Sequence, residues 1–122
     1  MKIDFNSDRP IFLQIAEGIE DAILSGAFLE ESQIPSITEF SVQYKINPAT
    51  ALKGINILVD GGIIYKKRGL GMFVATGAVD KLRQSRKEQF FDNYILSLIA
   101  EAKRLNLTSA EIKTMIERGF SV

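Results

Sequence analysis

The side chains that could do chemistry in this sequence are amines, guanidiniums, hydroxyls and carboxylates, because the chain has no histidine and no cysteine. It therefore lacks the usual zinc ligands, thiolate nucleophiles and disulfides, and also the side chain that most often acts as a base near neutral pH. Glu17, Glu20 and Asp21 share the outer face of a predicted helix, where charged residues normally serve solvation. We expect no catalytic residue, no metal site and no cofactor, and hence no enzyme activity.

Three consecutive cations, Lys66, Lys67 and Arg68, are the most prominent charged feature. The net charge is zero, with 15 basic and 15 acidic residues, but acidic residues predominate in residues 1–32 and basic residues in 33–87. A protein that binds nucleic acid needs a basic face rather than a basic total. The three cations could also form a merely solvated loop, so their meaning depends on the elements around them.

Three helices are predicted upstream of these cations. Apolar residues recur at helical spacing across 10–26. After an aperiodic segment, 27–35, which we expect to be a loop, Ser36 and a glutamate three residues later form a capping box that starts a short helix over 36–44. An asparagine followed by proline then starts a further helix over 47–61.

A β-hairpin with a basic tip is predicted next, because apolar residues at 63–65 and 72–74 flank the charged, glycine-rich segment 66–71. A helix, then two helices joined by a short turn, then a basic hairpin is the order of a winged helix-turn-helix. In that fold the helix from Asn47 can enter the major groove of DNA, while the hairpin tip lies along the backbone or minor groove. We expect a DNA-binding domain over residues 1–77.

Residues 78–122 are expected to form a separate, helical segment. The periodicity predicts a long helix over 80–105, and a capping box at Thr108 opens a last helix that Gly119 should stop. The apolar stripe of these helices is larger than two isolated helices can hide from water, which predicts a homodimer. The expected dimer-interface residues are Phe91, Tyr94, Ile95, Leu98, Ala102, Ile112, Met115 and Ile116. The predicted fold class is mainly α with a small β-hairpin: a winged helix-turn-helix domain plus a C-terminal two-helix dimerisation segment.

Five sequence blocks, in order and spacing, resemble the N-terminal domain of the GntR family of transcription regulators. They lie at 10–15, 34–36, 46–50, 60–64 and 68–74. The Asn-Pro-x-Thr helix start is similar to that of the YtrA-like subfamily, whose C-terminal part is a two-helix dimerisation segment of about this length. The resemblance implies a sequence-specific DNA-binding regulator, expected to be a repressor, that binds a pseudo-palindromic operator as a homodimer.

The chain departs from the family pattern at several DNA-reading positions. Thr38, Pro48 and Leu52 occupy positions where the family usually has arginine or a polar or basic residue. Gly54 stands where alanine is preferred, which should cost the helix roughly 1 kcal/mol. Lys53 is retained where a basic residue is common, so it is the best remaining candidate on this helix for a phosphate or guanine contact.

The expected DNA-binding residues combine helix starts with the hairpin tip. They are Ser36, Thr38, Asn47, Ala49, Thr50, Lys53, Lys66, Lys67, Arg68 and Gly69. For Ser36 and Thr50, capping alone and capping combined with a phosphate contact remain equally open.

The alternative function is a protein-interaction module that uses the winged fold without specific DNA binding, which would suit the missing arginines and the apolar Leu52, Ile57 and Val59. Absence of a membrane-length apolar run or a signal peptide leads us to expect a cytoplasmic location and no membrane partner. A small-molecule effector is not expected, because two helices offer little room for an enclosed pocket.

Overall fold

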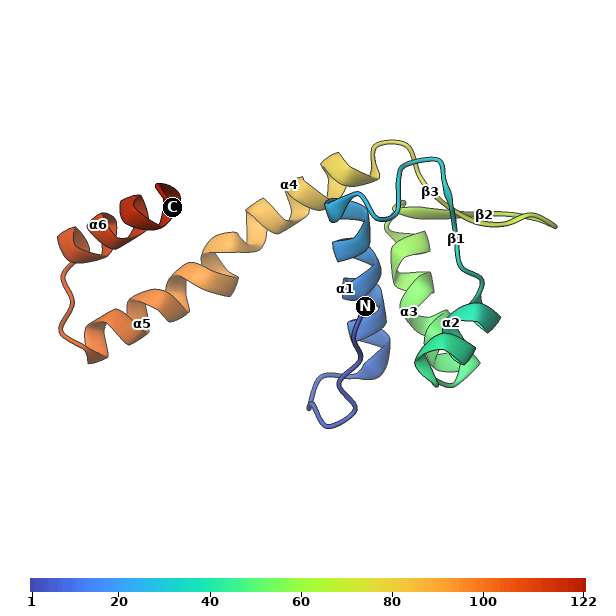
Figure 1. Cartoon of the computed structure of the whole chain (residues 1–122), viewed down its shortest axis with the longest axis horizontal. Helices are drawn as coiled ribbons and strands as arrows, with labels where there is room; N and C mark the ends of the chain where they lie inside the picture. Colours follow the sequence, from blue (N-terminus) through green and yellow to red (C-terminus); the bar gives the residue numbers. More distant parts are fainter. The chain divides into compact units, whose positions relative to one another are not determined.

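The computed structural model describes residues 1–122 and consists of two compact units, 1–84 and 85–122 (Figure 1). The first contains three helices, a small sheet and the start of α4 (Ala78–Phe90), and the second is helical. This confirms the predicted class, mainly helical with a small sheet. No helix combines the length and the apolar character needed to cross a membrane.

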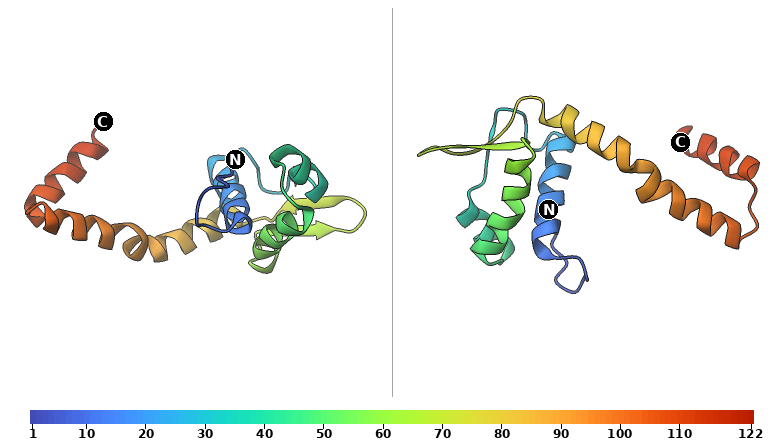
Figure 2. Two further views of the ribbon diagram at one scale, coloured as in Figure 1. Left: turned by 90° about the horizontal axis from the view of Figure 1, so that it is seen from below. Right: turned by 180° about the vertical axis from the view of Figure 1, so that it is seen from behind.

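Helices α1 (Ile11–Ser25) and α3 (Pro48–Asp60) pack side by side in the first unit (Figures 1 and 2). Their contact is close, since a Cβ atom added to Gly54 would lie 2.6 Å from the carbonyl oxygen of Phe12. The core that they share with the other elements consists of Ile15, Ala16, Ile19, Ile23, Ile34, Phe40, Ile46, Ala51, Ile55, Leu58, Ile63, Ile64, Met72, Val74, Ala78 and Leu82.

The predicted starts of the second and third helices are confirmed. The hydroxyl of Ser36 accepts a hydrogen bond from the Glu39 amide, and the Glu39 carboxylate accepts one from the Ser36 amide, so the capping box opens α2 (Ile37–Tyr44). Asn47 caps α3 by accepting a hydrogen bond from the Ala49 amide at 2.8 Å. Both caps satisfy backbone donors that a helix start leaves unpaired.

The first unit also contains a three-stranded antiparallel sheet of order β1-β3-β2, with β1 between α1 and α2 in the chain and β2 and β3 after α3. The hairpin β2 (Ile64–Lys67) and β3 (Gly71–Val74) is as predicted and projects from the helices (Figure 2). Lys66 and Lys67 belong to β2 rather than to the turn. The expectation of a loop over 27–35 is wrong at β1 (Gln33–Ile34), which pairs with β3 with Gln33 opposite Phe73.

The first unit extends beyond the boundary expected at Gly77. Ala78 and Leu82, on the first turns of α4, are buried in its core. Glu30 accepts hydrogen bonds from the Gly77 amide at 2.8 Å and the Val79 amide at 3.0 Å, which caps the start of this helix. The hydrogen bonds lower the pKa of Glu30, that from Gly77 most strongly.

In the second unit the continuous helix expected over 80–105 is interrupted by a π-helical turn, η1 (Phe91–Ile95), which precedes α5 (Leu96–Arg104). A capping box at Thr108 opens α6 (Ser109–Phe120), as predicted. Gly119 does not stop α6, which continues to Phe120. Glycine disfavours a helix but does not forbid it.

Candidate nucleic-acid interface

The start of α3 presents an exposed surface. Asn47 and Ala49 are exposed, Thr50 is half-buried, and Lys53 is exposed one turn further along. Asn47 uses only the oxygen of its amide group for the cap. The opposite face of α3 is buried through Ala51 and its helical neighbours. Four of the ten expected DNA-binding residues therefore lie on the first two turns of one helix.

Lys53 has a partner that the sequence did not indicate. Its Nζ atom lies 4.1 Å from the centroid of the Phe12 ring on α1. A lysine ammonium over an aromatic face is attracted by the electrons of the ring. Phe12 thus fixes the position of the one cation that this face of α3 carries near its start.

The hairpin cations are held by polar and aromatic neighbours. Lys66 Nζ donates a hydrogen bond to Asn56 Oδ1 of α3 at 3.2 Å. Lys67 Nζ lies 5.1 Å from the centroid of the Phe73 ring, and this ring stacks on Tyr65 across the two strands at 5.7 Å. These contacts link the basic strand to α3 and to the outer face of the sheet.

A groove of about 540 Å³ separates the start of α2 from the hairpin. The predicted residues that line it are Ser36, Thr38, Lys66, Lys67, Arg68 and Gly69. Hydroxyls at a helix start and cations on a facing hairpin are the groups that proteins use to hold phosphates. The structure thus brings together two parts of the predicted site that are about thirty residues apart in the sequence.

The hairpin is anchored at its base by Glu31, which the sequence did not single out. The Glu31 carboxylate accepts hydrogen bonds from the Thr76 hydroxyl and, at 2.9 Å, from the Tyr65 hydroxyl. These bonds, the one from Thr76 first, lower the pKa of Glu31. Glu31 has a positive φ of 66°. The carboxylate of Glu31 holds the base of the hairpin, whereas that of its neighbour Glu30 holds the start of α4.

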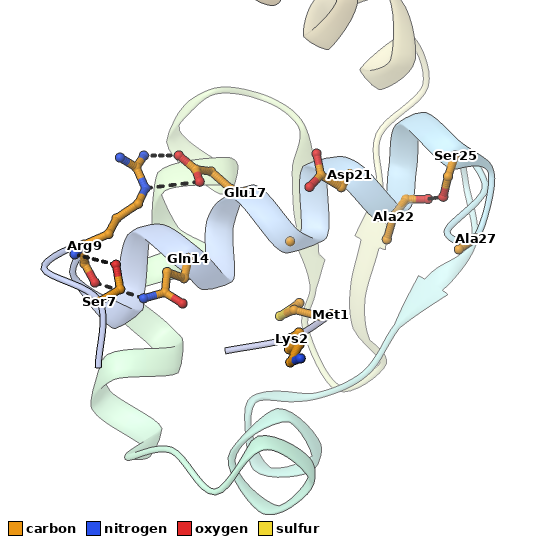
Figure 3. A pocket seen from close by; sticks show the side chains of 11 residues that line it. Met1, Lys2, Ser7, Arg9, Gln14, Glu17, Asp21, Ala22, Ser25 and Ala27 are labelled. Atoms are coloured by element: carbon orange, nitrogen blue, oxygen red, sulfur yellow. Dashed lines mark hydrogen bonds and ion pairs between the residues drawn. The ribbon is translucent and has the colours of Figure 1, made fainter. Parts of the chain in front are cut away.

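A second pocket lies along α1, under the N-terminal segment (Figure 3). The Gln14 side chain donates hydrogen bonds to the backbone oxygens of Asp4 and Arg9, and Arg9 forms an ion pair with Glu17. Glu17 therefore has a structural partner in addition to the expected contact with water. No cluster of carboxylates suited to a metal ion occurs here or elsewhere in the chain.

The second unit carries an uncovered apolar surface. Phe91, Tyr94 and Leu98 are exposed to 54%, 62% and 38%, although their side chains are apolar or aromatic. Ile95 and Ile112 are half-buried, while Ala102 is buried within the unit. A groove of about 370 Å³ between α5 and α6 is lined by Leu98, Glu101, Ala102, Leu105, Leu107, Ile112, Met115 and Ile116.

Two helices joined by a tight turn, preceded by a supporting helix and followed by a basic hairpin, define a winged helix-turn-helix protein. The comparisons with known proteins identify the particular family. The chain is 32% identical to the HTH-type transcriptional regulator YhcF of Bacillus subtilis, over 98% of this chain and 100% of YhcF. It is also 29% identical to the HTH-type transcriptional repressor YtrA of the same organism, over 70% of this chain and 66% of YtrA.

Solved structures agree with the sequence relatives. A GntR-family transcriptional regulator from Bacteroides thetaiotaomicron is 37% identical, with a TM-score of 0.74 over 91% of this chain and 96% of that one. The DNA-binding domain of AraR in complex with its operator ORX1 is 30% identical, with a TM-score of 0.57 over 62% of this chain and 96% of that one. No protein-family model matches the chain.

The chain belongs to the GntR family of transcription regulators, as its five sequence blocks predicted. It is a DNA-binding regulator and not an enzyme, because its relatives are transcription regulators.

Proposed function

We propose that this regulator binds a pseudo-palindromic operator as a homodimer, with the start of α3 in the major groove and the β2–β3 hairpin on the adjoining backbone or minor groove. The observation that carries the proposal is the groove in which Ser36 and Thr38 face Lys66, Lys67 and Arg68. A duplex offers phosphates on both sides of the groove that a helix enters. Hydroxyls and cations on two separate elements suit that arrangement.

The hydrogen bond from Lys66 to Asn56 supports a joint role for α3 and the hairpin. It ties a basic strand to the side of the helix that would read bases. The AraR domain, which resembles 62% of this chain, was solved with operator DNA. A protein that binds an operator must share a compartment with it, so the proposal includes the cytoplasmic location.

The proposed homodimer is supported by the apolar surface of the second unit. Exposed Phe91 and Tyr94, together with the groove between α5 and α6, leave apolar area in water that a second copy would cover. A two-fold dimer would carry two α3 helices to half-sites about one helical turn, or a multiple of it, apart. The second contact then becomes intramolecular and gains from a high effective concentration.

We assign the groove between α5 and α6 to the second copy rather than to a small-molecule effector. Glu101 is the only charged residue among those that line it. Effector sites usually carry several convergent polar groups that orient the ligand. Repression, rather than activation, is supported by the relative YtrA, which is a repressor.

The alternative, an interaction module without DNA binding, has less support. Of its three apolar residues, Leu52 and Val59 are half-buried, and only Ile57 is exposed, to 41%. The experiment that decides is capture of fragmented genomic DNA by the full-length protein, followed by sequencing. We expect a few enriched sites that share an inverted repeat, whereas recovery of random fragments would contradict the proposal.

A further inference from the structure

Leu70 is an exposed apolar side chain in the most basic segment of the chain. It is exposed to 65% and directly follows the three cations and Gly69. Single exposed leucines are common on protein surfaces and need no explanation by themselves. Leu70 differs from such residues because the backbone on both sides of it is held in place.

The turn that carries Leu70 is held by two hydrogen bonds. The Leu70 amide donates to the Lys67 carbonyl oxygen at 3.0 Å, which closes the turn. The Gln33 side-chain amide, from β1, donates to the Leu70 carbonyl oxygen at 2.8 Å. The backbone of Leu70 is therefore fixed from its own hairpin and from a neighbouring strand.

The flanking glycines are required by this geometry. Gly69 and Gly71 have φ angles of 78° and 127°, which residues other than glycine rarely adopt. A Cβ atom on Gly71 would lie 2.5 Å from the Gln33 amide nitrogen, so Gly71 also makes room for the Gln33 side chain that donates to Leu70. The result is a preformed tip with an apolar side chain in water and cations beside it.

We propose that Leu70 is an apolar wedge that enters the minor groove of the operator and selects base steps that kink easily. The inference rests on the proposed function. Lys67 and Arg68 would bring the tip to the phosphates, which all sequences share. Leucine cannot form hydrogen bonds with base edges, but apolar wedges partly unstack a base step, and flexible pyrimidine–purine steps resist this least.

The test uses full-length protein and a duplex selected by the wild type from a random library. Leu70→Ala is compared with Leu29→Ala, because Leu29 is equally exposed, at 64%, and lies far from the tip in the sequence. Fluorescence anisotropy at several salt concentrations gives affinity, and energy transfer between dyes on the duplex ends gives bending. Thermal melting of each variant checks folding.

We expect Leu70→Ala to lose roughly tenfold in affinity for the selected duplex, to bend it less, and to keep the salt dependence of the wild type, since no charge is removed. Leu70→Met should restore both affinity and bending, and Leu29→Ala should match the wild type. Equal bending by Leu70→Ala and the wild type would overturn the wedge and leave the proposed function intact. If the wild type selects no sequence, the proposed function fails and the wedge with it.

Discussion

The Nζ atom of Lys53 lies 4.1 Å from the centroid of the Phe12 ring. This contact joins the exposed side of α3 to α1, the helix that supports it. A cation–π contact at an exposed site is worth about 0.5–1 kcal/mol. Phe12 can thus hold the ammonium in place without preventing its transfer to a phosphate or guanine.

If Lys53 contacts guanine, Lys53→Ala should weaken binding to the operator by about 1–3 kcal/mol. Binding to random DNA should weaken much less. The reason is that a base contact exists only on the right sequence. Titration of both duplexes by anisotropy measures the two changes in affinity. Equal changes on the two duplexes would make Lys53 a phosphate contact instead.

Gly54→Ala should destabilise the fold by about 1 kcal/mol or more, although alanine favours helices. The added Cβ would meet the Phe12 carbonyl oxygen at 2.6 Å and the Ile15 Cβ at 3.1 Å, so α1 and α3 would have to move apart. Gly119→Ala is the matched control, because α6 has open space there, and it should be neutral or stabilising. Urea unfolding measures both, and a stabilised Gly54→Ala would contradict the close packing.

Acidification should weaken the attachment of α4 through Glu30. The pKa of Glu30 is lowered in the folded state, so its contribution is complete above the unfolded pKa, about 4.3, and is lost as the pH falls towards the folded value. Glu30→Gln removes the titration. The difference in unfolding free energy between wild type and variant should be smaller at about pH 3 than at about pH 7. An equal difference at both pH values would contradict a stabilising role of the Glu30 carboxylate.

A charge in the apolar surface of the second unit should separate the dimer. Leu98→Glu places a carboxylate in the groove between α5 and α6, which an apolar interface does not tolerate. A chain that ends after Gln84, which keeps the buried Ala78 and Leu82, should also be monomeric and bind a half-site only weakly. Sedimentation of these proteins and of the wild type measures their oligomeric states. A monomeric wild type or a dimeric truncated chain would refute the assignment of the dimer interface to the second unit.

Local signals in the sequence predicted most of the helix starts. The capping boxes at Ser36 and Thr108 and the Asn47 cap act within three residues, so they can be recognised without knowledge of the fold. The hairpin could also be predicted, because its apolar strands and glycine-rich tip are adjacent in the sequence. The π-helical turn at Phe91–Ile95 was not predicted, because the residues there carry no distinguishing pattern.

Features that depend on distant partners were missed. Strand β1 has only two residues and exists because Gln33 and Ile34 pair with β3, far along the chain. The boundary expected at Gly77 ignored the burial of Ala78 and Leu82, which arises only when α4 meets the folded core. Of the proposed site, the sequence suggested the cations, which stay a prediction. It did not suggest the Phe12, Asn56 and Gln33 side chains that contact Lys53, Lys66 and the backbone of the hairpin tip.

Salt-dependent DNA binding through the hairpin is the property that most directly distinguishes a DNA-binding wing from a solvated loop. The measurement is titration of the full-length protein with DNA from upstream of its own gene and with unrelated DNA, at a low and a high salt concentration. Wild type should prefer the upstream DNA and weaken with salt. Replacing Lys66, Lys67 and Arg68 by alanine should weaken binding to both DNAs and lower the salt slope by about 0.9 for each phosphate that the protein no longer neutralises. Alanines at Lys103, Arg104 and Lys113 of the second unit remove the same charge and should leave the slope nearly unchanged. No binding of the wild type at low salt, or a hairpin variant with wild-type affinity and slope, would contradict a DNA-binding role for the hairpin.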